Sequence, residues 1–490
     1  MNFNSGIFLI FLPVVVTVYW LLPHHFRWVW LLGASCFFYM YWKPALIFLI
    51  FLTTIVSYTA ARLMERFPKR KKAFLTITAV ICLGILAYFK YANFFLESAA
   101  AVFGLSDLPV LSILLPVGIS FYTFQTLSYV IDVSRGDFLA EHHFGYYALF
   151  IIFFPQLVAG PIETPGKLLS QLKQKHTFSA DDFSLGIRFL LLGFFKKCAV
   201  ADFVGIYVNA VFSNPESFSP VSLILTGFLF CIQMYCDFSG YSEIAAGCAR
   251  LLGIRLTQNF NRPYLSQSYS EFFRRWHITL NRWFTSYVYI PLGGNRKGTM
   301  CRLLNTIIVF SLCGLWHGAR WTYVLWGLYA AFFVCLESLF KKKKTPSGRK
   351  IAFVCSPTSI LRIVCMFVLF IPSALLFRCD SLSQAGLIAA MLLTGWHSTL
   401  TSLPSQLSTM GITADIFIQI FLLIVAMGVL DARIQTKICD TSVTEHSRTN
   451  SPCFCVSQMT SFVYLILIIA LSWLFLLSNQ DTAGFAYFQF

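Results

Sequence analysis

The sequence predicts an all-α membrane protein that crosses the bilayer many times, and two observations support this fold class. Hydrophobic residues make up 57% of the 490 residues and charged residues only 12%, with a mean hydropathy of +0.70, whereas soluble domains carry roughly 25% charged residues. Apolar windows near or above the roughly 18-residue length that crosses a bilayer recur from one end of the chain to the other. We therefore expect about ten to thirteen crossings, several of them tilted, broken or re-entrant.

The expected spans form a single integral-membrane domain over residues 1–490, whose three parts differ in how many polar motifs they contain. Residues 1–105 and 350–490 are plain apolar spans, whereas residues 108–335 hold nearly all of the unusual polar motifs. The segment before the first span, Met1 to Gly6, lacks the basic region of a cleaved signal peptide, so we expect this span to be retained. We place the spans at about 6–22, 28–42, 45–62, 73–90, 108–132, 145–160, 184–212, 219–236, 303–317, 321–340, 360–377, 412–430 and 460–477.

The formal net charge is +16, and the positions of the basic residues predict the topology. The loops at residues 69–72 and 341–350 are rich in lysine and arginine, and we expect both to face the cytoplasm by the positive-inside rule. We attribute the remaining charge to contact with anionic membrane lipids, and expect no nucleic-acid partner because the basic residues are dispersed among the spans. The 15 cysteines show no paired spacing, and no His/Cys cluster has the spacing of metal ligands, so we expect no metal site.

A histidine and an arginine lie inside the long apolar stretch 303–340, in the sequence Trp316-His317-Gly-Ala-Arg320. Ionisable groups at such depth are rare and usually functional. The 14 residues from Leu303 to Trp316 make about 21 Å of helix, short of the roughly 30 Å hydrocarbon core. We therefore expect either that His317 lies within the membrane interior or that the bilayer is locally thin there, with a helix break after His317. A neutral histidine facing a water-filled passage is suited to act as a general base; the alternative is a histidine of the interfacial aromatic belt.

A second polar cluster lies in the segment Glu271 to Ile290, which we interpret as one amphipathic helix at the membrane interface or lining the bundle. His277 on this helix is a candidate to orient or polarise a second reactant, and the arginines are candidates to hold an anionic donor; a simple surface anchor is the alternative. Its apolar side carries Phe272, Phe273, Trp276, Leu280, Trp283, Phe284 and Tyr287, and its polar side carries Arg274, Arg275, His277, Asn281, Arg282 and Thr285.

Upstream, two carboxylates and several hydroxyls follow an apolar span in the segment from Tyr235 to Glu243. Buried carboxylates need partners of opposite charge. We expect Asp237 and Glu243, with Ser239 beside them, to support the site by pairing with Arg274, Arg275 or Arg282.

The chain resembles the membrane-bound O-acyltransferases, and most closely their bacterial alginate O-acetyltransferase branch. The likeness covers nearly the whole chain and rests on ordered motifs: Pro116-Val-Gly-Ile-Ser-Phe-Tyr-Thr-Phe-Gln125, Phe154-Pro-Gln-Leu-Val-Ala-Gly-Pro-Ile-Glu163, Asp237-Phe-Ser-Gly-Tyr-Ser242, Glu271-Phe-Phe-Arg-Arg-Trp-His277, Tyr289-Ile-Pro-Leu-Gly-Gly-Asn-Arg296, Leu315-Trp-His-Gly-Ala319 and Phe485-Ala-Tyr-Phe-Gln-Phe490.

This resemblance implies a ring of tilted helices around a thinned centre, with a tunnel that connects the two membrane faces. It also implies that His317 is the essential histidine and His277 the second active-site histidine, with Gln125, Trp276 and Trp316 as supporting residues. The chain departs from the usual family pattern at three places. Thr285-Ser286 replaces a common Arg-Asp, Thr164 replaces an arginine, and Ala330 replaces a histidine, which puts partner docking and donor details in doubt.

The resulting hypothesis is acyl transfer through a bacterial inner membrane to an exported polysaccharide or a partner protein. We expect a cytoplasmic thioester donor, such as acetyl-CoA or an acyl carrier, no tightly bound cofactor, and a periplasmic partner resembling an acetyltransferase or esterase. Two alternatives remain. The first is D-alanyl transfer to teichoic acid, whose membrane component belongs to the same family. The second is a transporter of polar lipid or glycan, although the internal repeats common in transporters are not evident.

Overall fold

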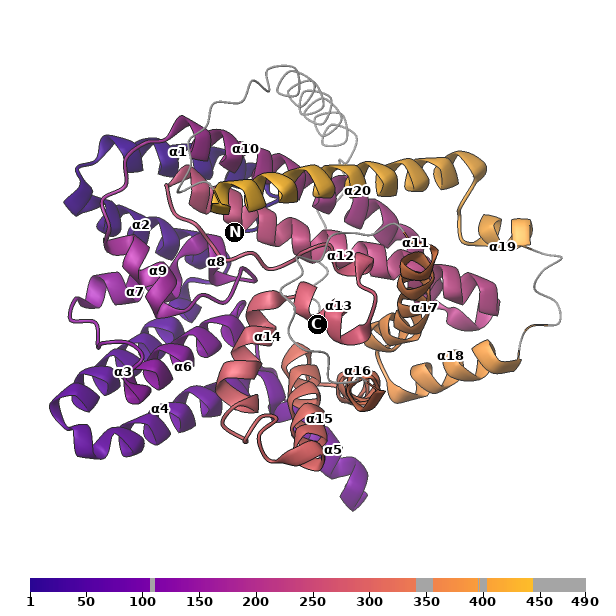
Figure 1. The fold of residues 1–490 in the computed structure, drawn as a ribbon, viewed down its shortest axis with the longest axis horizontal. Coiled ribbons are helices and arrows are strands. Elements are labelled where there is room, and N and C mark those ends of the chain that lie inside the picture. The colour runs from indigo at the N-terminus through magenta and orange to yellow at the C-terminus, as the bar shows by residue number, and fades with distance from the viewer. Residues whose placement is uncertain (106–110, 341–355, 395, 397–402, 444–490) are drawn as a thin grey trace. The chain divides into compact units, whose positions relative to one another are not determined.

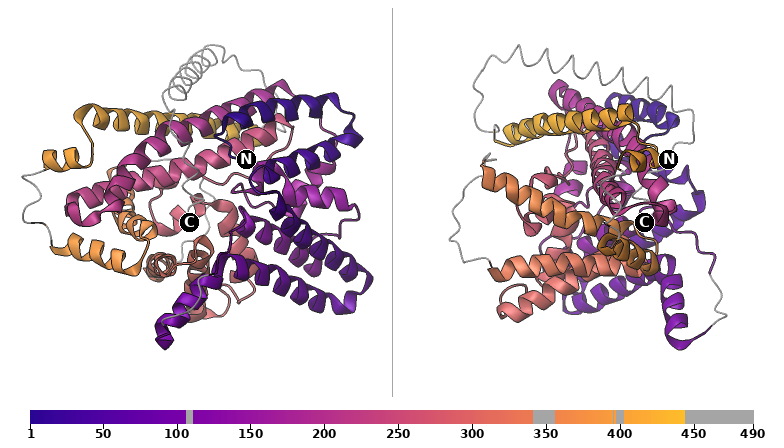
Figure 2. Two further views of the ribbon diagram at one scale, coloured as in Figure 1. Left: turned by 180° about the vertical axis from the view of Figure 1, so that it is seen from behind. Right: turned by 90° about the vertical axis from the view of Figure 1, so that its right-hand side faces the viewer.

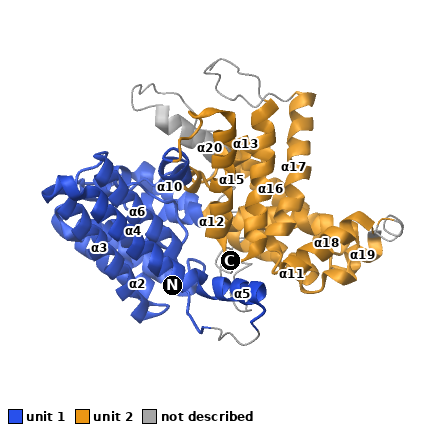
Figure 3. Ribbon diagram, turned by 90° about the horizontal axis from the view of Figure 1, so that it is seen from below, with its two compact units in different colours: residues 1–190, 241–258, 282–291 blue, residues 191–240, 259–281, 292–490 orange. Residues whose placement is uncertain are grey.

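The computed structural model describes residues 1–105, 111–340, 356–394, 396 and 403–443, the last eleven by their backbone only. Over these residues every regular element is helical, as the composition predicts (Figure 1). The chain folds into two compact units, drawn in different colours in Figure 3. Unit 1 comprises Met1–Leu190, Tyr241–Gln258 and Arg282–Pro291, and unit 2 comprises Leu191–Gly240, Asn259–Asn281 and Leu292–Phe490. The predicted basic loop 341–350, the span 460–477 and the closing motif at 485–490 lie outside the described residues.

Unit 1 is built mainly from the amino-terminal spans. Its helices are α1 (Gly6–Leu21), α2 (His24–Met40), α3 (Ile47–Arg66), α4 (Lys71–Leu86), α5 (Ala92–Phe103), α6 (Ile119–Arg135), α7 (Phe144–Ile152), α8 (Phe154–Leu157), α9 (Pro165–Lys173) and most of α10 (Ala180–Phe194). A π-helical turn at Ala87–Tyr91 joins α4 to α5.

The core of unit 1 forms around α6, in which every residue from Ile119 to Val130 is buried. Gly118 starts this helix with a positive φ of 75°, and a Cβ there would lie 2.5 Å from the main-chain oxygen of Leu157, so only glycine fits this turn. The indole ring of Trp283 stacks on Phe124 at 3.7 Å and donates a hydrogen bond of 3.0 Å to its carbonyl. The span expected at 108–132 therefore begins as a helix only at Ile119.

Unit 2 contains the long helices of the carboxyl-terminal half (Figures 1 and 2). Its elements are a π-helical turn at Phe195–Ala201, α11 (Asp202–Ser213), most of α12 (Pro220–Leu251), α13 (Tyr269–Arg275), the start of α14 (Ile278–Phe284), α15 (Gly298–His317), α16 (Trp321–Phe340), α17 (Pro357–Arg378), α18 (Leu382–Thr394), α19 (Leu403–Thr409) and α20 (Ala414–Val443).

Seven helical segments among the described residues are long and apolar enough to cross a membrane, which agrees with a multi-pass membrane protein. Other expected spans are shorter or interrupted: α1 and α2 have 16 and 17 residues, and the span expected at 184–212 is divided by the π-helical turn at Phe195–Ala201. The seven segments are Pro44–Arg66, Pro68–Phe103, Pro220–Leu251, Gly298–His317, Trp321–Phe340, Pro357–Arg378 and Ala414–Ala432.

Two predictions about local structure were wrong. The helix before His317 begins at Gly298, so it has 20 residues and is about 30 Å long, which is enough to cross the hydrocarbon core. Its length therefore does not place His317 in mid-membrane. The segment from Glu271 to Ile290 is not one helix, because α13 ends at Arg275 and α14 begins at Ile278. Its apolar side is nonetheless buried as the periodicity predicts, from Phe272 to Phe284.

Candidate active site

His317 is the last residue of α15 and is surrounded by aromatic rings. Its side chain lies edge-on to three rings, with centroid distances of 5.0 Å to Trp316, 5.2 Å to Trp326 and 5.3 Å to Phe377. The residue is 8% exposed, so it is not on the outer surface of unit 2. The helix break predicted after it is confirmed, since α16 begins at Trp321. The rings hold the imidazole in one orientation inside an apolar wall.

Close packing of α15 against α16 fixes the place of His317. A Cβ at Gly314 would collide with the carbonyl oxygen of Tyr323, and one at Gly327 would collide with the carbonyl oxygen of Phe310. A Cβ at Gly318 would collide with the Tyr323 ring. Small residues let helix backbones approach closely in membrane proteins. The glycines on both helices therefore bring Trp326 against the imidazole.

His277 lies in the two-residue turn between α13 and α14 and is 1% exposed. Its φ of 44° is left-handed, which is uncommon for a residue with a side chain. Two asparagines hold the turn. The Asn259 carbonyl accepts from the N–H of Ile278 at 2.9 Å, and the Asn281 amide donates to the carbonyls of Trp276 at 2.6 Å and His277 at 3.3 Å. Asn281 thus holds the backbone around His277 by hydrogen bonds.

The structure brings His277 and His317 together within unit 2. The Trp316 ring contacts both, at 5.8 Å from the His277 ring and 5.0 Å from the His317 ring. Burial, and then the nearby His317, hold the pKa of His277 well below its usual range. His277 is therefore neutral near pH 7, and a neutral imidazole has one nitrogen that donates and one that accepts.

Unit 2 also contains buried ion pairs, and their cations are lysines that the sequence analysis did not name. Asp237 pairs with Lys197 at 2.7 Å, and Lys197 also pairs with Asp202 at 2.8 Å. The neighbouring Lys196 pairs with Asp431 at 2.5 Å, and Asp431 also accepts a hydrogen bond from the Tyr235 hydroxyl. The partner that the structure shows for Asp237 is thus a lysine of the π-helical turn, which the sequence analysis did not name. Phe238 follows Asp237 on α12 and packs edge-on against His277 at 4.7 Å.

The other predicted residues of unit 2 differ in exposure and in their partners. Arg275 pairs with Glu271 at 2.5 Å and Arg274 is exposed. Trp276 is buried edge-on against Phe260 at 5.0 Å. Ser239 is buried in α12.

Three predicted residues belong to unit 1. Gln125 is buried and donates to the Phe150 carbonyl at 2.6 Å. Arg282 is exposed and acts electrostatically on the buried Glu163. Glu243 lies in the last part of α12.

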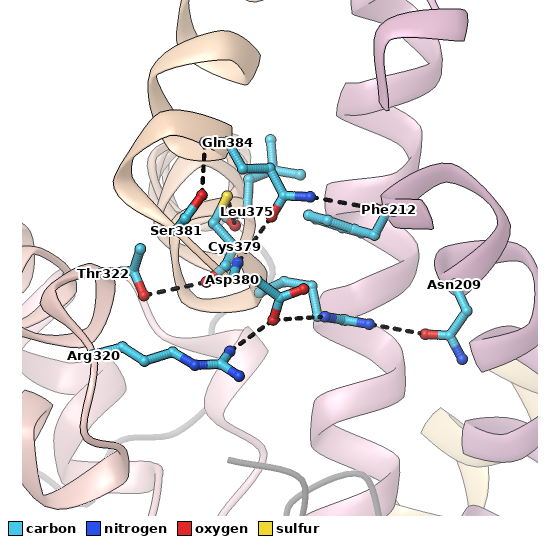
Figure 4. A network of polar contacts seen from close by, with 10 residues as sticks. Asn209, Phe212, Arg320, Thr322, Leu375, Cys379, Asp380, Ser381 and Gln384 are labelled. Carbon is cyan, nitrogen blue, oxygen red and sulfur yellow. Dashed lines mark hydrogen bonds and ion pairs between the residues drawn. The ribbon is translucent and has the colours of Figure 1, made fainter. Parts of the chain in front are cut away.

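A network of charged residues in unit 2 joins the start of α16 to the residues around the end of α17 (Figure 4). Arg320, three residues after His317, pairs with Asp380 at 2.6 Å. Arg378, next to the Phe377 that packs on His317, lies 3.9 Å from the same carboxylate and donates to Asn209 at 3.2 Å. The side chains of Arg320 and Asp380 are 41% and 61% exposed. Charged and partly exposed side chains thus lie close in sequence to His317 and to the Phe377 ring that packs on it.

Sequence reasoning missed Asn259, Lys196, Lys197 and Asp431. The sequence could have indicated the two lysines, because two adjacent cations in the expected apolar span 184–212 require carboxylate partners. Over the described residues, no three His, Cys, Asp or Glu side chains gather as a metal site requires.

Comparison with known proteins adds an independent finding. The profile of the membrane-bound O-acyltransferase family matches residues 133–372. The chain is 36% identical to a probable alginate O-acetylase of Azotobacter vinelandii, over 84% of this chain and 82% of the relative. It is 34% identical to a peptidoglycan O-acetyltransferase of Helicobacter pylori, over 66% and 68%. It is 28% identical to a teichoic acid D-alanyltransferase of Bacillus subtilis, over 51% and 65%.

Proposed function

Because this chain belongs to the membrane-bound O-acyltransferase family and is an O-acyltransferase, we propose that it carries acetyl groups across a bacterial inner membrane for O-acetylation of an exported polysaccharide. The relatives with the higher identities are named as acetylating enzymes of alginate and peptidoglycan, which supports acetyl as the group and a polysaccharide as the acceptor. The acetyl donor of this proposal is a cytoplasmic thioester.

The observation that carries the proposal is the pair of buried histidines on one aromatic wall, His317 at the end of α15 and His277 in the α13–α14 turn. In this mechanism His317 takes the proton of the accepting hydroxyl as its oxygen attacks the thioester carbonyl carbon. The carbon–sulfur bond then breaks, the thiolate leaves, and it regains a proton from His317. The products are an ester and a thiol. General base catalysis of this kind contributes about 10²–10⁴-fold to a rate.

The directions of the helices support an acceptor that arrives from outside. Helices α16 and α17 have 20 and 22 residues, and the basic segment that begins at Lys341 joins them. If that segment is cytoplasmic by the positive-inside rule, the opposite helix ends at Trp321 and Arg378 face outward. His317 then opens toward the acceptor side, and the donor reaches it from the cytoplasm. A periplasmic partner protein that passes the acetyl group to the glycan belongs to the same proposal.

The direct test replaces His317 by alanine in the full-length protein. We expect acetylation of the surface glycan to fall by about 10²–10⁴-fold, measured as ester-bound acetate, while the protein still inserts into the membrane. His25→Ala is the matched control, because His25 is an exposed histidine of unit 1. Acetylation at the wild-type level in the correctly inserted His317→Ala protein would refute the role of His317.

D-alanyl transfer is the second candidate function, favoured by the likeness to the D-alanyltransferase. The two functions differ in the acyl group that becomes attached. Purified protein in vesicles, offered a labelled acetyl thioester and a labelled D-alanyl thioester in separate assays, is expected to consume the acetyl donor. Consumption of the D-alanyl donor alone would reverse this assignment.

A further inference from the structure

One side-chain oxygen organises the polar surroundings of His277. Asn259 Oδ1 lies 3.1 Å from His277 Nδ1, 3.2 Å from the main-chain nitrogen of Thr279 and 2.9 Å from the Thr279 hydroxyl. Asn259, His277 and Thr279 are all buried. A buried oxygen with three polar neighbours needs donors from them, because unsatisfied buried polar groups are costly.

The chemistry of these neighbours fixes the proton on His277. Oxygen and nitrogen of an asparagine amide are ordinarily assigned from the hydrogen-bond network. Here the Thr279 main-chain N–H can only donate, so the Asn259 atom that faces it must be the oxygen. That oxygen cannot donate to His277 Nδ1, so Nδ1 must carry the hydrogen. In the neutral ring Nε2 then carries the lone pair.

We propose that Asn259 is a positioning residue that holds His277 as the Nδ1–H tautomer, so that His277 accepts a hydrogen bond through Nε2 during acyl transfer. This inference rests on the proposed function and refines it. A neutral imidazole with its lone pair on Nε2 can accept a hydrogen bond from a second hydroxyl of the acceptor, and this orients the attacking oxygen, whose own hydrogen goes to His317. The same nitrogen cannot polarise the thioester carbonyl, because that role needs a donor. His277 therefore serves the acceptor, and the thioester carbonyl must find its donor elsewhere.

The left-handed turn explains why an asparagine at 259 can reach both atoms. The Asn259 carbonyl accepts from the N–H of Ile278, and its side-chain oxygen accepts from the N–H of Thr279. The carbonyl and the side chain of Asn259 thus both bind the chain just after His277, which keeps Oδ1 within hydrogen-bond distance of Nδ1.

The groups that face His277 come from three elements. Helix α12 presents Phe238, the segment around Asn259 presents Phe260, and α15 presents Trp316 with His317. His317 is the titratable group that acts on the ring, and the turn adds its own main-chain groups. Replacement of Asn259 by a residue of different charge should therefore be visible in the titration of His277.

The test uses two substitutions at Asn259 in the full-length enzyme in lipid nanodiscs. Asn259→Asp keeps an acceptor in place and adds a negative charge, which raises the pKa of the neighbouring imidazole. We expect the acidic limb of the kcat profile to move to higher pH by about one unit or more. Asn259→Leu removes the acceptor and should lower kcat by about 10–100-fold, the loss seen when the orienting partner of a metal-ligating histidine is removed, with little change in the KM for the acetyl donor.

The matched control is Asn261→Asp, which adds the same charge two residues away, where the main-chain N–H of Asn261 donates to the Arg275 carbonyl. We expect its acidic limb to stay at the wild-type position. An Asn259→Asp enzyme that folds, as judged by thermal unfolding, and keeps the wild-type pH profile would overturn the proposal.

A second measurement does not depend on turnover. Nitrogen NMR of the histidine-labelled protein, assigned with a His277→Gln variant, reports which ring nitrogen carries the hydrogen. We expect Nδ1 to be protonated and Nε2 not. A protonated Nε2 in the neutral ring would overturn the tautomer assignment even if the protein transferred acetyl groups. Conversely, loss of the proposed function would leave this measurement intact.

Discussion

His277 holds a conformation that a residue with a side chain rarely adopts. Its φ of 44° lies in the left-handed region, where a Cβ approaches the following carbonyl at a cost of about 1–2 kcal/mol. Asn259 and Asn281 offset this cost by hydrogen bonds on the two sides of the turn. Such strain persists only where the surroundings enforce it, and it gathers at functional sites. Because of this turn, His277 does not continue the helix that carries Arg274 and Arg275, and its ring is buried beside Trp316.

The strain makes a prediction about two substitutions that both remove the imidazole. His277→Gly and His277→Ala lose the same ring contacts, but glycine adopts positive φ without the Cβ penalty. We expect the glycine variant to be more stable than the alanine variant by about 1 kcal/mol, measured by thermal unfolding in detergent. Both should lose acetyl transfer to a similar extent. Equal stability, or a more stable alanine variant, would mean that the turn relaxes to an ordinary conformation.

At the scale of elements, α15 and α16 form a hairpin whose approach is set by glycine. Gly314 on α15 faces the carbonyl of Tyr323, and Gly327 on α16 faces the carbonyl of Phe310. The neighbours in both places are main-chain atoms, which cannot rotate away as a flexible side chain would. The hairpin positions His317 at the end of one helix and Trp326 on the other, at 5.2 Å.

Gly327→Ala should therefore separate the two helices. We expect a loss of about 1–3 kcal/mol, the usual cost of overpacking, together with reduced acetyl transfer, because Trp326 would move away from His317. Gly84→Ala on α4 is the matched control, since a Cβ there meets no atom within 4 Å and alanine favours helix. Thermal unfolding and acetylation of both variants are the measurements. A Gly327→Ala protein as stable and active as Gly84→Ala would contradict the close approach.

These elements also show what the sequence can predict. The periodicity of the segment 271–290 correctly indicated its buried side, because burial repeats with the helical turn. It gave no sign of the break at His277, since no glycine or proline marks it and its cause lies 18 residues upstream at Asn259. Apolar length indicated His317 as an unusual residue, but its helix begins five residues earlier than expected, at Gly298. The partner of Lys196 is 235 residues away at Asp431, a distance over which local patterns carry no information.

Over the molecule as a whole, two groups of charged residues can be distinguished among the described residues of unit 2. Lys196 and Lys197 are fully buried and each is paired with a carboxylate, as charges inside an apolar bundle must be. Arg320, Arg378 and Asp380 instead gather where α16 begins and α17 ends, with exposed side chains among them (Figure 4). The first group stabilises the fold. The second marks a helix end that reaches water.

The side of the membrane on which this end lies decides the direction of acyl transfer. Helix α15 runs from Gly298 to His317 over about 30 Å, so Lys297 before it and Ser381 beyond Arg378 are expected at opposite faces. Both positions are exposed. With the basic segment from Lys341 in the cytoplasm, we expect a cysteine introduced by Ser381→Cys to react with a membrane-impermeant maleimide in intact spheroplasts. A cysteine introduced by Lys297→Cys should react only after the membrane is permeabilised. The unsubstituted protein reports the background from its own cysteines. The reverse labelling pattern would turn His317 toward the cytoplasm, and the acceptor would then have to be modified before export rather than after it.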